Sequence, residues 1–382
     1  MEKVNSNIQE KKKIFFPNLD GLRFFSFFLV FFSHAFSTKY ESIKNEAWYQ
    51  IFKFRLFQEG DMGVSFFFVL SGFLITYLLI KEKEYTNHID VKNFYIRRAL
   101  RIWPLYFFCV FFGFVLFPFF KSYFGQVPTE SANPILCSTF LNNFDRIING
   151  PPDSSVLSVL WSVAIEEQFY VVWPILFLVI PPKKFPYVFI AIISISLLYR
   201  FLYINSKIDT HTLGVISDMA IGGLGAYLII NSKSVMNWFQ HTKGIYHLIP
   251  YLLTVIILCF KSQIFQADIM IVFKRVITSL IFIWIILEQN FSEKSLFKVS
   301  NLKYISFLGK YTYGLYCLHP IANLITLIVL SYLNLNQYSW QLWLIELPFS
   351  LGLSIGISMI SYHLFESKFL KIKDRFAVIV KA

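Results

Sequence analysis

Apolar stretches separated by short polar segments follow one another along almost the whole chain. About ten of them approach the ~20 residues that a helix needs to cross a hydrocarbon core of ~30 Å. These predicted spans lie at 19–36, 63–80, 102–120, 159–180, 185–204, 212–231, 245–260, 269–287, 311–333 and 339–364. The runs are continuous, and backbone groups in lipid must pair within their own segment, so the pattern predicts helices rather than barrel strands.

The composition agrees with this pattern. Hydrophobic residues make up 56% of the 382 residues and charged residues only 15%, and the mean hydropathy is +0.55, which excludes an ordinary soluble domain. We therefore expect an all-α polytopic integral membrane protein with a single transmembrane domain over residues 1–382. Residues 1–18 form its predicted cytoplasmic N-terminal segment, and residues 366–382 form its predicted cytoplasmic tail.

The placement of basic residues predicts the orientation. Roughly two thirds of the 35 lysines and arginines fall on the side of the N-terminus, and cytoplasmic loops carry such an excess. Both termini are therefore predicted to be cytoplasmic. The net charge of +12 lies beside apolar segments and suits the headgroups of a lipid bilayer, so nucleic acid is not an expected partner.

The first predicted span carries polar residues that its apolar surroundings do not explain. In "LDGLRFFSFFLVFFSHAF", Arg23 and His34 are 11 residues apart, which places them on one helix face about 16 Å apart along the axis. Arg23 can then meet a cytoplasmic anion, while His34 lies toward the outer half. The alternative interpretation is an arginine that reaches the interface and a histidine hydrogen-bonded at the outer boundary.

A second group of charges lies at the predicted entry of the third span. In "FYIRRALRIWPLYFF", Arg98 and Arg101 are three residues apart, so both guanidinium groups can grip one anion, and guanidinium suits phosphate. The alternative is simple flanking of a span by positive charge.

The third group opens the fourth span. In "LWSVAIEEQFYVVWP", Ser162, Glu166 and Tyr170 fall on one stripe of a helix, and Glu167 is turned about 100° away. A buried carboxyl group can exchange a proton or orient a neighbouring histidine. The alternative is a capping arrangement at the outer interface.

Weaker signals lie in the second span and near the C-terminus. His319 precedes Pro320, which disfavours helix at 319, so we expect the span to break there and the histidine to lie at a boundary. The small residues of "GVSFFFVLSGFLITYLL" predict close helix packing. Further candidates of the same type are Glu346, His363 and Glu366.

The order of these motifs resembles the acyltransferase 3 family of multi-pass membrane acyltransferases. The chain carries that family's Arg-x10-His pattern, its second-helix motif in "GVSFFFVLSGFLI" and its R-x-x-R in "RRALRIWPLYF". "LWSVAIEEQFYVVWP", "YTYGLYCLHP" and "SYHLFESKF" are similar to three further motifs. Val163 replaces the usual leucine, and Ser367-Lys368 replaces a common Arg-Pro, so no role is carried over to that arginine.

The resemblance implies transfer of an acyl group, most often acetyl, from cytoplasmic acyl-CoA to a hydroxyl of a carbohydrate. The expected acceptors are O-antigen, exopolysaccharide, capsule or similar glycans at the bacterial inner membrane, and no metal or permanently bound cofactor is required. The expected binding residues for the CoA phosphates are Arg23, Arg98 and Arg101.

His34 is the expected general base or transient acyl acceptor, and Glu166 is expected to orient or assist its imidazole. The expected supporting residues are Asp20, Ser162, Glu167, Tyr170 and His319. A hydrogen bond to Glu166 is a simpler role for Ser162 than that of nucleophile.

Two other classes of protein remain as alternatives. A transporter or flippase also lines its bundle with charges, but such proteins often show inverted repeats, and none is visible in this sequence. A non-catalytic sensor or scaffold is the other alternative. We expect no second domain after residue 382, and therefore expect the chain to work alone or with a separate partner.

Overall fold

The computed structural model describes residues 12–35, 38–56, 60–204, 206–376 and 379–380. The first eleven residues of the predicted N-terminal segment, the last residue of the first predicted span and parts of the predicted tail lie outside these ranges. The described chain is almost entirely helical, which confirms the predicted fold class.

The structure contains most of the predicted spans as long helices. Within the described ranges, nine helices are long and apolar enough to cross a membrane: Asp61–Thr86, Val91–Tyr123, Ser155–Val179, Pro182–Leu202, Thr212–Asn231, Gly244–Ile264, Asp268–Phe291, Thr312–Tyr332 and Ser339–Phe376. They correspond to nine of the ten predicted spans. The first predicted span is the 19-residue helix α1 (Pro17–Ala35), whose polar residues at both ends lower its hydropathy.

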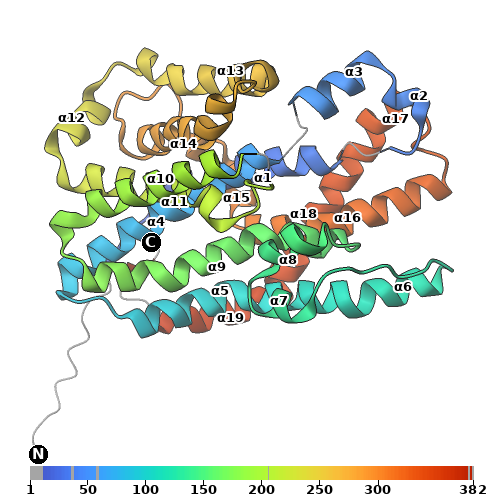
Figure 1. Ribbon diagram of the computed structural model, residues 1–382, viewed down its shortest axis with the longest axis horizontal. Helices are drawn as coiled ribbons and strands as arrows, with labels where there is room; N and C mark the ends of the chain where they lie inside the picture. The colour runs from blue at the N-terminus through green and yellow to red at the C-terminus, as the bar shows by residue number, and fades with distance from the viewer. Residues whose placement is uncertain (1–11, 36–37, 57–59, 205, 377–378, 381–382) are drawn as a thin grey trace, which may run out of the picture.

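The main α-helix of each of these nine spans carries the label given in Figure 1. They are α4 (Asp61–Thr86), α5 (Val91–Phe111), α9 (Ser155–Val179), α10 (Phe185–Leu202), α11 (Thr212–Asn231), α13 (Ile249–Ile264), α14 (Asp268–Phe291), α16 (Thr312–Tyr332) and α18 (Leu347–Ser361).

Short elements connect or extend these helices. The short α-helices are α2 (Glu41–Lys44), α3 (Ala47–Tyr49), α6 (Phe117–Tyr123), α7 (Pro134–Ser138), α8 (Asn142–Asn149), α12 (Lys233–His241), α15 (Lys303–Gly309), α17 (Ser339–Gln341) and α19 (Ser367–Lys373). The π-helical turns are η1 (Gln50–Leu56), η2 (Phe112–Leu116), η6 (Leu342–Glu346) and η7 (Tyr362–Glu366), and the 3₁₀ turns are η3 (Pro182–Lys184), η4 (Gly244–Leu248), η5 (Val299–Asn301) and η8 (Asp374–Phe376). Two parallel two-residue strands, β1 (Lys12–Lys13) and β2 (Ile379–Val380), pair near the chain ends.

The third span begins earlier than its hydropathy predicts. The predicted span starts at residue 102, but α5 starts at Val91, where the side chain of Asp90 accepts a hydrogen bond from the backbone N–H of Asn93. Three arginines follow in the first turns of α5, and their charge lowers the local hydropathy, so the hydropathy pattern does not predict this part of the helix. Arg98 and Arg101 therefore lie inside a helix and not at its entry.

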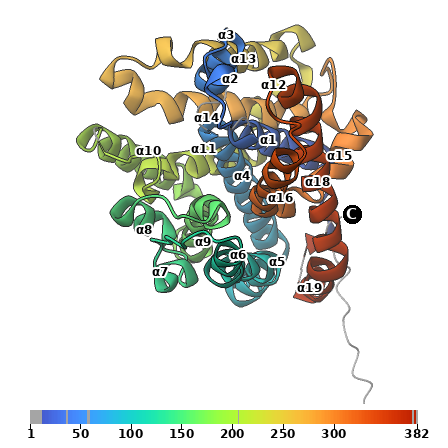
Figure 2. The ribbon, with the colours of Figure 1, turned by 90° about the vertical axis from the view of Figure 1, so that its right-hand side faces the viewer.

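Helix α1 occupies the centre of the bundle. It contacts α4, α14, α15 and α16, and Figures 1 and 2 show it crossing the middle of the molecule in both views. A helix in this position brings its polar residues to several partners at once.

Helices α4 and α11 lie unusually close together, as the small residues of the second span predict. A Cβ atom on Gly72 of α4 would lie 2.1 Å from the carbonyl oxygen of Met219, and a Cβ atom on Gly222 of α11 would lie 2.2 Å from that of Val69. Only glycine permits backbones to approach this closely.

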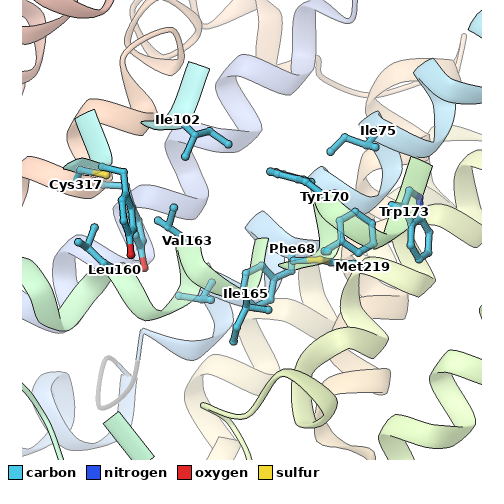
Figure 3. Close-up of a cluster of buried hydrophobic side chains, with 14 of the residues drawn as sticks. Phe68, Ile75, Ile102, Leu160, Val163, Ile165, Tyr170, Trp173, Met219 and Cys317 are labelled. Carbon is cyan, nitrogen blue, oxygen red and sulfur yellow. The ribbon is translucent and has the colours of Figure 1, made fainter. Parts of the chain in front are cut away.

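The largest apolar cluster forms around α9. Figure 3 shows side chains of α4, α9 and α11 packed together, among them Phe68, Trp173 and Met219, with the ring of Tyr170 in the same cluster. The indole N–H of Trp173 donates to the hydroxyl of Thr76 at 2.9 Å, so even the polar edge of this cluster is satisfied. This packing holds α9 rigidly against α4.

Buried charges join α10, α11 and α14. Arg275 donates two hydrogen bonds to the carboxylate of Asp218, at 3.0 and 2.5 Å, and both side chains are almost fully buried. Arg200 is also buried and is paired with Asp209 at 2.8 Å. Since each of these buried cations has an anionic partner, the group is a structural cross-link between helices.

Candidate functional site

Two histidines from distant parts of the chain meet at the end of α1. The Nδ1 atom of His34 lies 2.8 Å from the Nε2 atom of His319 on α16. The two rings are nearly parallel, with an angle of 8° between their planes. His319 is fully buried, whereas His34 is exposed. The predicted boundary position of His319 is therefore wrong.

The surroundings of His319 determine which nitrogen of each ring carries a proton. The Nδ1 atom of His319 lies 2.8 Å from the carbonyl oxygen of Tyr316 and 3.1 Å from that of Leu315. Carbonyl oxygens only accept, so Nδ1 must carry the hydrogen, and Nε2 of the neutral ring must accept from His34. His34 then donates through Nδ1, and its own lone pair is on Nε2.

Pro320 makes this arrangement possible without ending the helix. The expectation that the span breaks at residue 319 is wrong, because α16 runs through the proline. Proline has no N–H, so the carbonyl group of Tyr316, four residues earlier, receives no helical hydrogen bond from it. That carbonyl group instead accepts the Nδ1–H of His319. The Leu-His-Pro order thus supplies both the imidazole and the acceptor that orients it.

Arginines from α1 and α5 gather near the other end of α1. Arg23 is paired with Asp20 at 2.9 Å and lies close enough to Arg101 for their charges to interact. The guanidinium group of Arg98 lies over the rings of Phe94 and Tyr170, at 5.4 and 5.5 Å from their centroids. The structure therefore brings together the three predicted arginines.

Neighbouring arginines of α5 differ in their pairing. Arg97 is bonded to Glu82 at 3.1 Å and to the carbonyl oxygen of Phe376 at 2.8 Å. The buried Nε atom of Arg98 has no hydrogen-bond partner, and across the described residues Arg101 makes no hydrogen bond or ion pair with the protein. Two guanidinium groups beside Arg23 thus retain donors for an anion.

Glu166 belongs to the arginine end of the site. Its carboxylate accepts a hydrogen bond from the hydroxyl of Ser71 at 2.7 Å, and the hydroxyl of Tyr170 donates to Ser71 at 3.3 Å. The charges of Arg98 and Arg101 act on the same carboxylate. The structure therefore gives His34 a histidine as its hydrogen-bond partner and places the expected partner, Glu166, against Ser71.

The adjacent carboxylate points elsewhere, as the helical period predicts. Glu167 accepts the indole N–H of Trp103 at 2.8 Å through Oε2, while its Oε1 atom is buried without a hydrogen-bond partner in the described part of the chain. Trp103 is on α5, whereas Ser71 is on α4, so the two neighbouring glutamates face different helices.

Ser162 connects α9 to the turn that holds His319. Its hydroxyl lies 2.5 Å from the hydroxyl of Tyr316 and 3.3 Å from the carbonyl oxygen of Val159. The expected hydrogen bond to Glu166 is wrong, because Ser162 faces α16. The same Tyr316 provides the carbonyl group that accepts from His319.

Two cations near His34 were not predicted from the sequence. Lys53, in η1, donates to the carbonyl oxygen of Ser33 at 2.8 Å, and burial lowers its pKa to about 8. Arg146, on α8, donates to the carbonyl and hydroxyl oxygens of Ser158, both at 2.9 Å. The charges of both act on the imidazole of His34. They lie in segments outside the apolar spans, where no local pattern distinguishes them from ordinary loop cations.

Comparisons with known proteins agree with the motifs. A family model described as "Acyltransferase domain", of the acyltransferase 3 family, matches residues 16–363. No solved structure matches the chain.

Three relatives illustrate the similarity. The chain is 25% identical to a Staphylococcus aureus protein named "Putative O-acetyltransferase" over 97% of its own length and 60% of that protein. It is 25% identical to "Peptidoglycan O-acetyltransferase OatA" of Listeria monocytogenes, over 81% of the chain and 50% of that protein. It is 32% identical to "Putative peptidoglycan O-acetyltransferase YrhL" of Bacillus subtilis, over 44% of the chain and 24% of that protein.

The chain thus spans 60% or less of the length of these three relatives. The family match, by contrast, covers nearly the whole chain, from the segment before the Arg-x10-His pattern to the last long helix. On this match, the chain belongs to the acyltransferase 3 family.

Proposed function

We propose that the protein is a membrane O-acyltransferase that moves an acyl group, most often acetyl, from cytoplasmic acyl-CoA to a hydroxyl of a cell-surface or lipid-linked carbohydrate. The observation that carries this proposal is the position of α1. One continuous helix presents Arg23 to the arginine group and, about 16 Å farther along, His34 to His319. An anion site and a base are thus held at a fixed separation.

The arginine end suits the donor. CoA carries several phosphate groups, and Arg98 and Arg101 have guanidinium donors that no carboxylate of the described residues occupies. Arg23 adds a third charge, with Asp20 orienting it. With both termini in the cytoplasm, as the basic residues predict, this end of α1 faces the compartment that contains acyl-CoA.

The histidine end suits the transfer step. The Nε2 atom of His34 takes the proton of the acceptor hydroxyl, the hydroxyl oxygen forms a bond to the acyl carbon, and the bond from that carbon to the CoA sulfur breaks. The proton then passes from the imidazolium to the departing thiolate. His319 fixes the tautomer that this step requires, and its Nε2 lone pair favours the positive charge that develops on His34.

A second route uses the same atom. In it, Nε2 of His34 forms a bond to the acyl carbon, the bond from that carbon to the CoA sulfur breaks, and the thiolate leaves. The acceptor hydroxyl oxygen then forms a bond to the acyl carbon, the bond to Nε2 breaks, and the hydroxyl proton passes to Nε2 and from there to the thiolate. Glu166 and Tyr170, which are hydrogen-bonded through Ser71 beside the arginines, then support the donor and not the imidazole.

The names of two relatives support the proposed class of acceptor. Two of them are named for O-acetylation of peptidoglycan, and a carbohydrate at the outer side of the inner membrane is the corresponding acceptor here. O-antigen, exopolysaccharide and capsule are acceptors of the same chemical class.

Transfer of label tests this function. Membranes containing wild-type protein, His34→Ala or His88→Ala at matched levels receive acetyl-labelled acetyl-CoA, and alkali-labile label in the glycan is measured. His88 is an exposed histidine that contacts only its own turn in the described part of the chain, so its variant is the control. We expect His34→Ala to lose at least about 100-fold in rate. Equal transfer by His34→Ala would remove the histidine from the mechanism.

A further inference from the structure

A small cavity opens beside the proposed base. It lies between the end of α1, α16 and the junction of η6 with α18, and His34 forms part of its wall. Only about 10 Å³ is available to the centre of a water-sized group, which is room for about one hydroxyl group or water molecule. The cavity is therefore large enough for one functional group of a substrate, and too small for a sugar ring.

Glu346 is the most unusual residue of this cavity. Its side chain is 4% exposed, and its Oε2 atom is buried without a hydrogen-bond partner among the residues that the structure describes. A buried carboxyl oxygen without a hydrogen bond is costly, and Glu346 lines a cavity, so this combination points to a ligand that supplies the missing bond. Glu346 ends the π-helical turn η6, and such turns often occur at functional sites.

The other polar groups of the cavity complement Glu346. The hydroxyl of Ser350 donates to the side-chain oxygen of Asn323 and thereby directs the amide nitrogen away from Ser350. In the described residues, no hydrogen bond from that nitrogen to the protein is present, so it is a donor for a ligand. Thr326 donates to the carbonyl oxygen of Ala322 and keeps its lone pairs as acceptors.

This set of groups favours a hydroxyl ligand. A hydroxyl group both donates and accepts, so it can donate to Glu346 and accept from Asn323. The methyl group of an acetyl donor would need an apolar pocket, and only Ala35 and Leu327 are apolar among the lining residues. The cavity thus matches the acceptor and not the donor.

We propose that this cavity holds a second hydroxyl or hydroxymethyl group of the acceptor sugar, next to the hydroxyl that His34 deprotonates. Glu346 and Asn323 then position the acceptor, and the enzyme selects sugars that carry a hydroxyl beside the reacting one. This inference rests on the proposed function and deepens it, because it assigns an acceptor subsite distinct from the arginine group.

Two variants test the subsite. Glu346→Gln keeps the size of the side chain but replaces one acceptor oxygen with a donor, and Ser350→Val fills the cavity with a methyl group. Ser354→Ala is the matched control, since Ser354 is buried one turn farther along α18 and donates only to the backbone carbonyl of Ser350 in the described chain.

The measurements are label transfer from acetyl-CoA into membrane glycan and retention of labelled acetyl-CoA by the purified protein. We expect both cavity variants to lose roughly tenfold or more in transfer, the usual effect of losing a hydrogen bond to a carboxyl group, with acetyl-CoA retention within about twofold of wild type. Ser354→Ala should match wild type in both. If Glu346→Gln does not fold, Ser350→Val alone tests the subsite. Retention of acetyl-CoA by Ser350→Val then shows that this variant is folded.

The outcomes separate this inference from the proposed function. Normal transfer by Glu346→Gln and Ser350→Val, with an active wild type, would overturn the subsite alone. Parallel loss of transfer and acetyl-CoA retention would also overturn it, because the cavity would then serve the donor. Absence of transfer by the wild type would overturn the proposed function and the subsite with it.

Discussion

Nδ1 of His34 donates to Nε2 of His319 across 285 residues of sequence, at 2.8 Å. His34 must be the donor, because Nδ1 of His319 donates its hydrogen to backbone carbonyl groups of α16 and Nε2 of His319 can then only accept. In this neutral pair a second imidazole orients the imidazole of His34. In a serine hydrolase triad, by comparison, a buried aspartate has the orienting role.

The His34–His319 pair predicts a non-additive set of variants. His319→Ala should lower the rate of label transfer about 10- to 100-fold, because the tautomer of His34 is no longer fixed. The double variant His34→Ala/His319→Ala should be no slower than His34→Ala alone. Rates at matched protein levels measure this, and fully additive losses would show that the two histidines act independently.

The two neighbouring arginines of α5 should differ in kinetics. Arg98→Gln should raise the KM for acetyl-CoA roughly tenfold or more with little change in kcat, because it removes a charged donor for phosphate. Arg97→Gln should leave that KM unchanged, since Arg97 is already paired with Glu82. Initial rates at varied acetyl-CoA concentration measure both. Equal effects of the two changes would mean that Arg98 acts only as a flanking charge.

Lys53 should make stability depend on pH. Burial lowers the pKa of Lys53 to about 8 from its ordinary value of 10.5, so the unfolded chain holds this proton more tightly than the folded one. The contribution of Lys53 to the free energy of unfolding therefore rises as pH increases from about 8 to about 10.5. The rise is at most about 3 kcal/mol, at about 1.4 kcal/mol per pH unit.

Thermal unfolding of the detergent-solubilised protein at pH 7.5 and 9.5 measures this effect. Lys53→Met should be less sensitive to pH than wild type and more stable at the lower pH. Identical pH profiles for the two proteins would show that Lys53 is well solvated.

The contact between α4 and α11 should be intolerant of one added carbon atom. Gly72→Ala places a Cβ atom 2.1 Å from a backbone oxygen of α11, so we expect a loss of about 1–3 kcal/mol from overpacking. Gly352→Ala is the control, since nothing lies within 4 Å of its added Cβ atom and alanine favours helix by up to about 1 kcal/mol. Thermal unfolding midpoints distinguish the two, and equal midpoints would mean that the helices shift freely.

Hydropathy predicted the helices well where charge did not interrupt them. The span at 212–231 has the same bounds as Thr212–Asn231. The third span was predicted to start eleven residues too late, because Arg97, Arg98 and Arg101 lower the hydropathy of a segment that Asp90 caps as helix. Hydropathy measures transfer to lipid, whereas Arg97 is paired with Glu82 and Arg98 lies over the rings of Phe94 and Tyr170.

The site was predictable in its residues but not in its pairings. The spacing of Arg23 and His34 placed them on one helix, which the structure has as α1. The expected partner of His34 was Glu166, but Glu166 accepts from Ser71, and Ser162 faces Tyr316. The residues near Glu166 in the sequence do not predict which helix packs against it.

By itself, the sequence determined that this is a helical membrane protein, where its helices lie and which motifs it shares with a family. These properties depend on side chains within about one span of each other, because burial in lipid and the helical period act locally. Only the tertiary structure decided that His34 meets His319 and that Glu346 lies beside the base with one carboxyl oxygen unbonded to any described residue. Hydrogen bonds between helices depend on which faces pack together, and the whole bundle determines that packing.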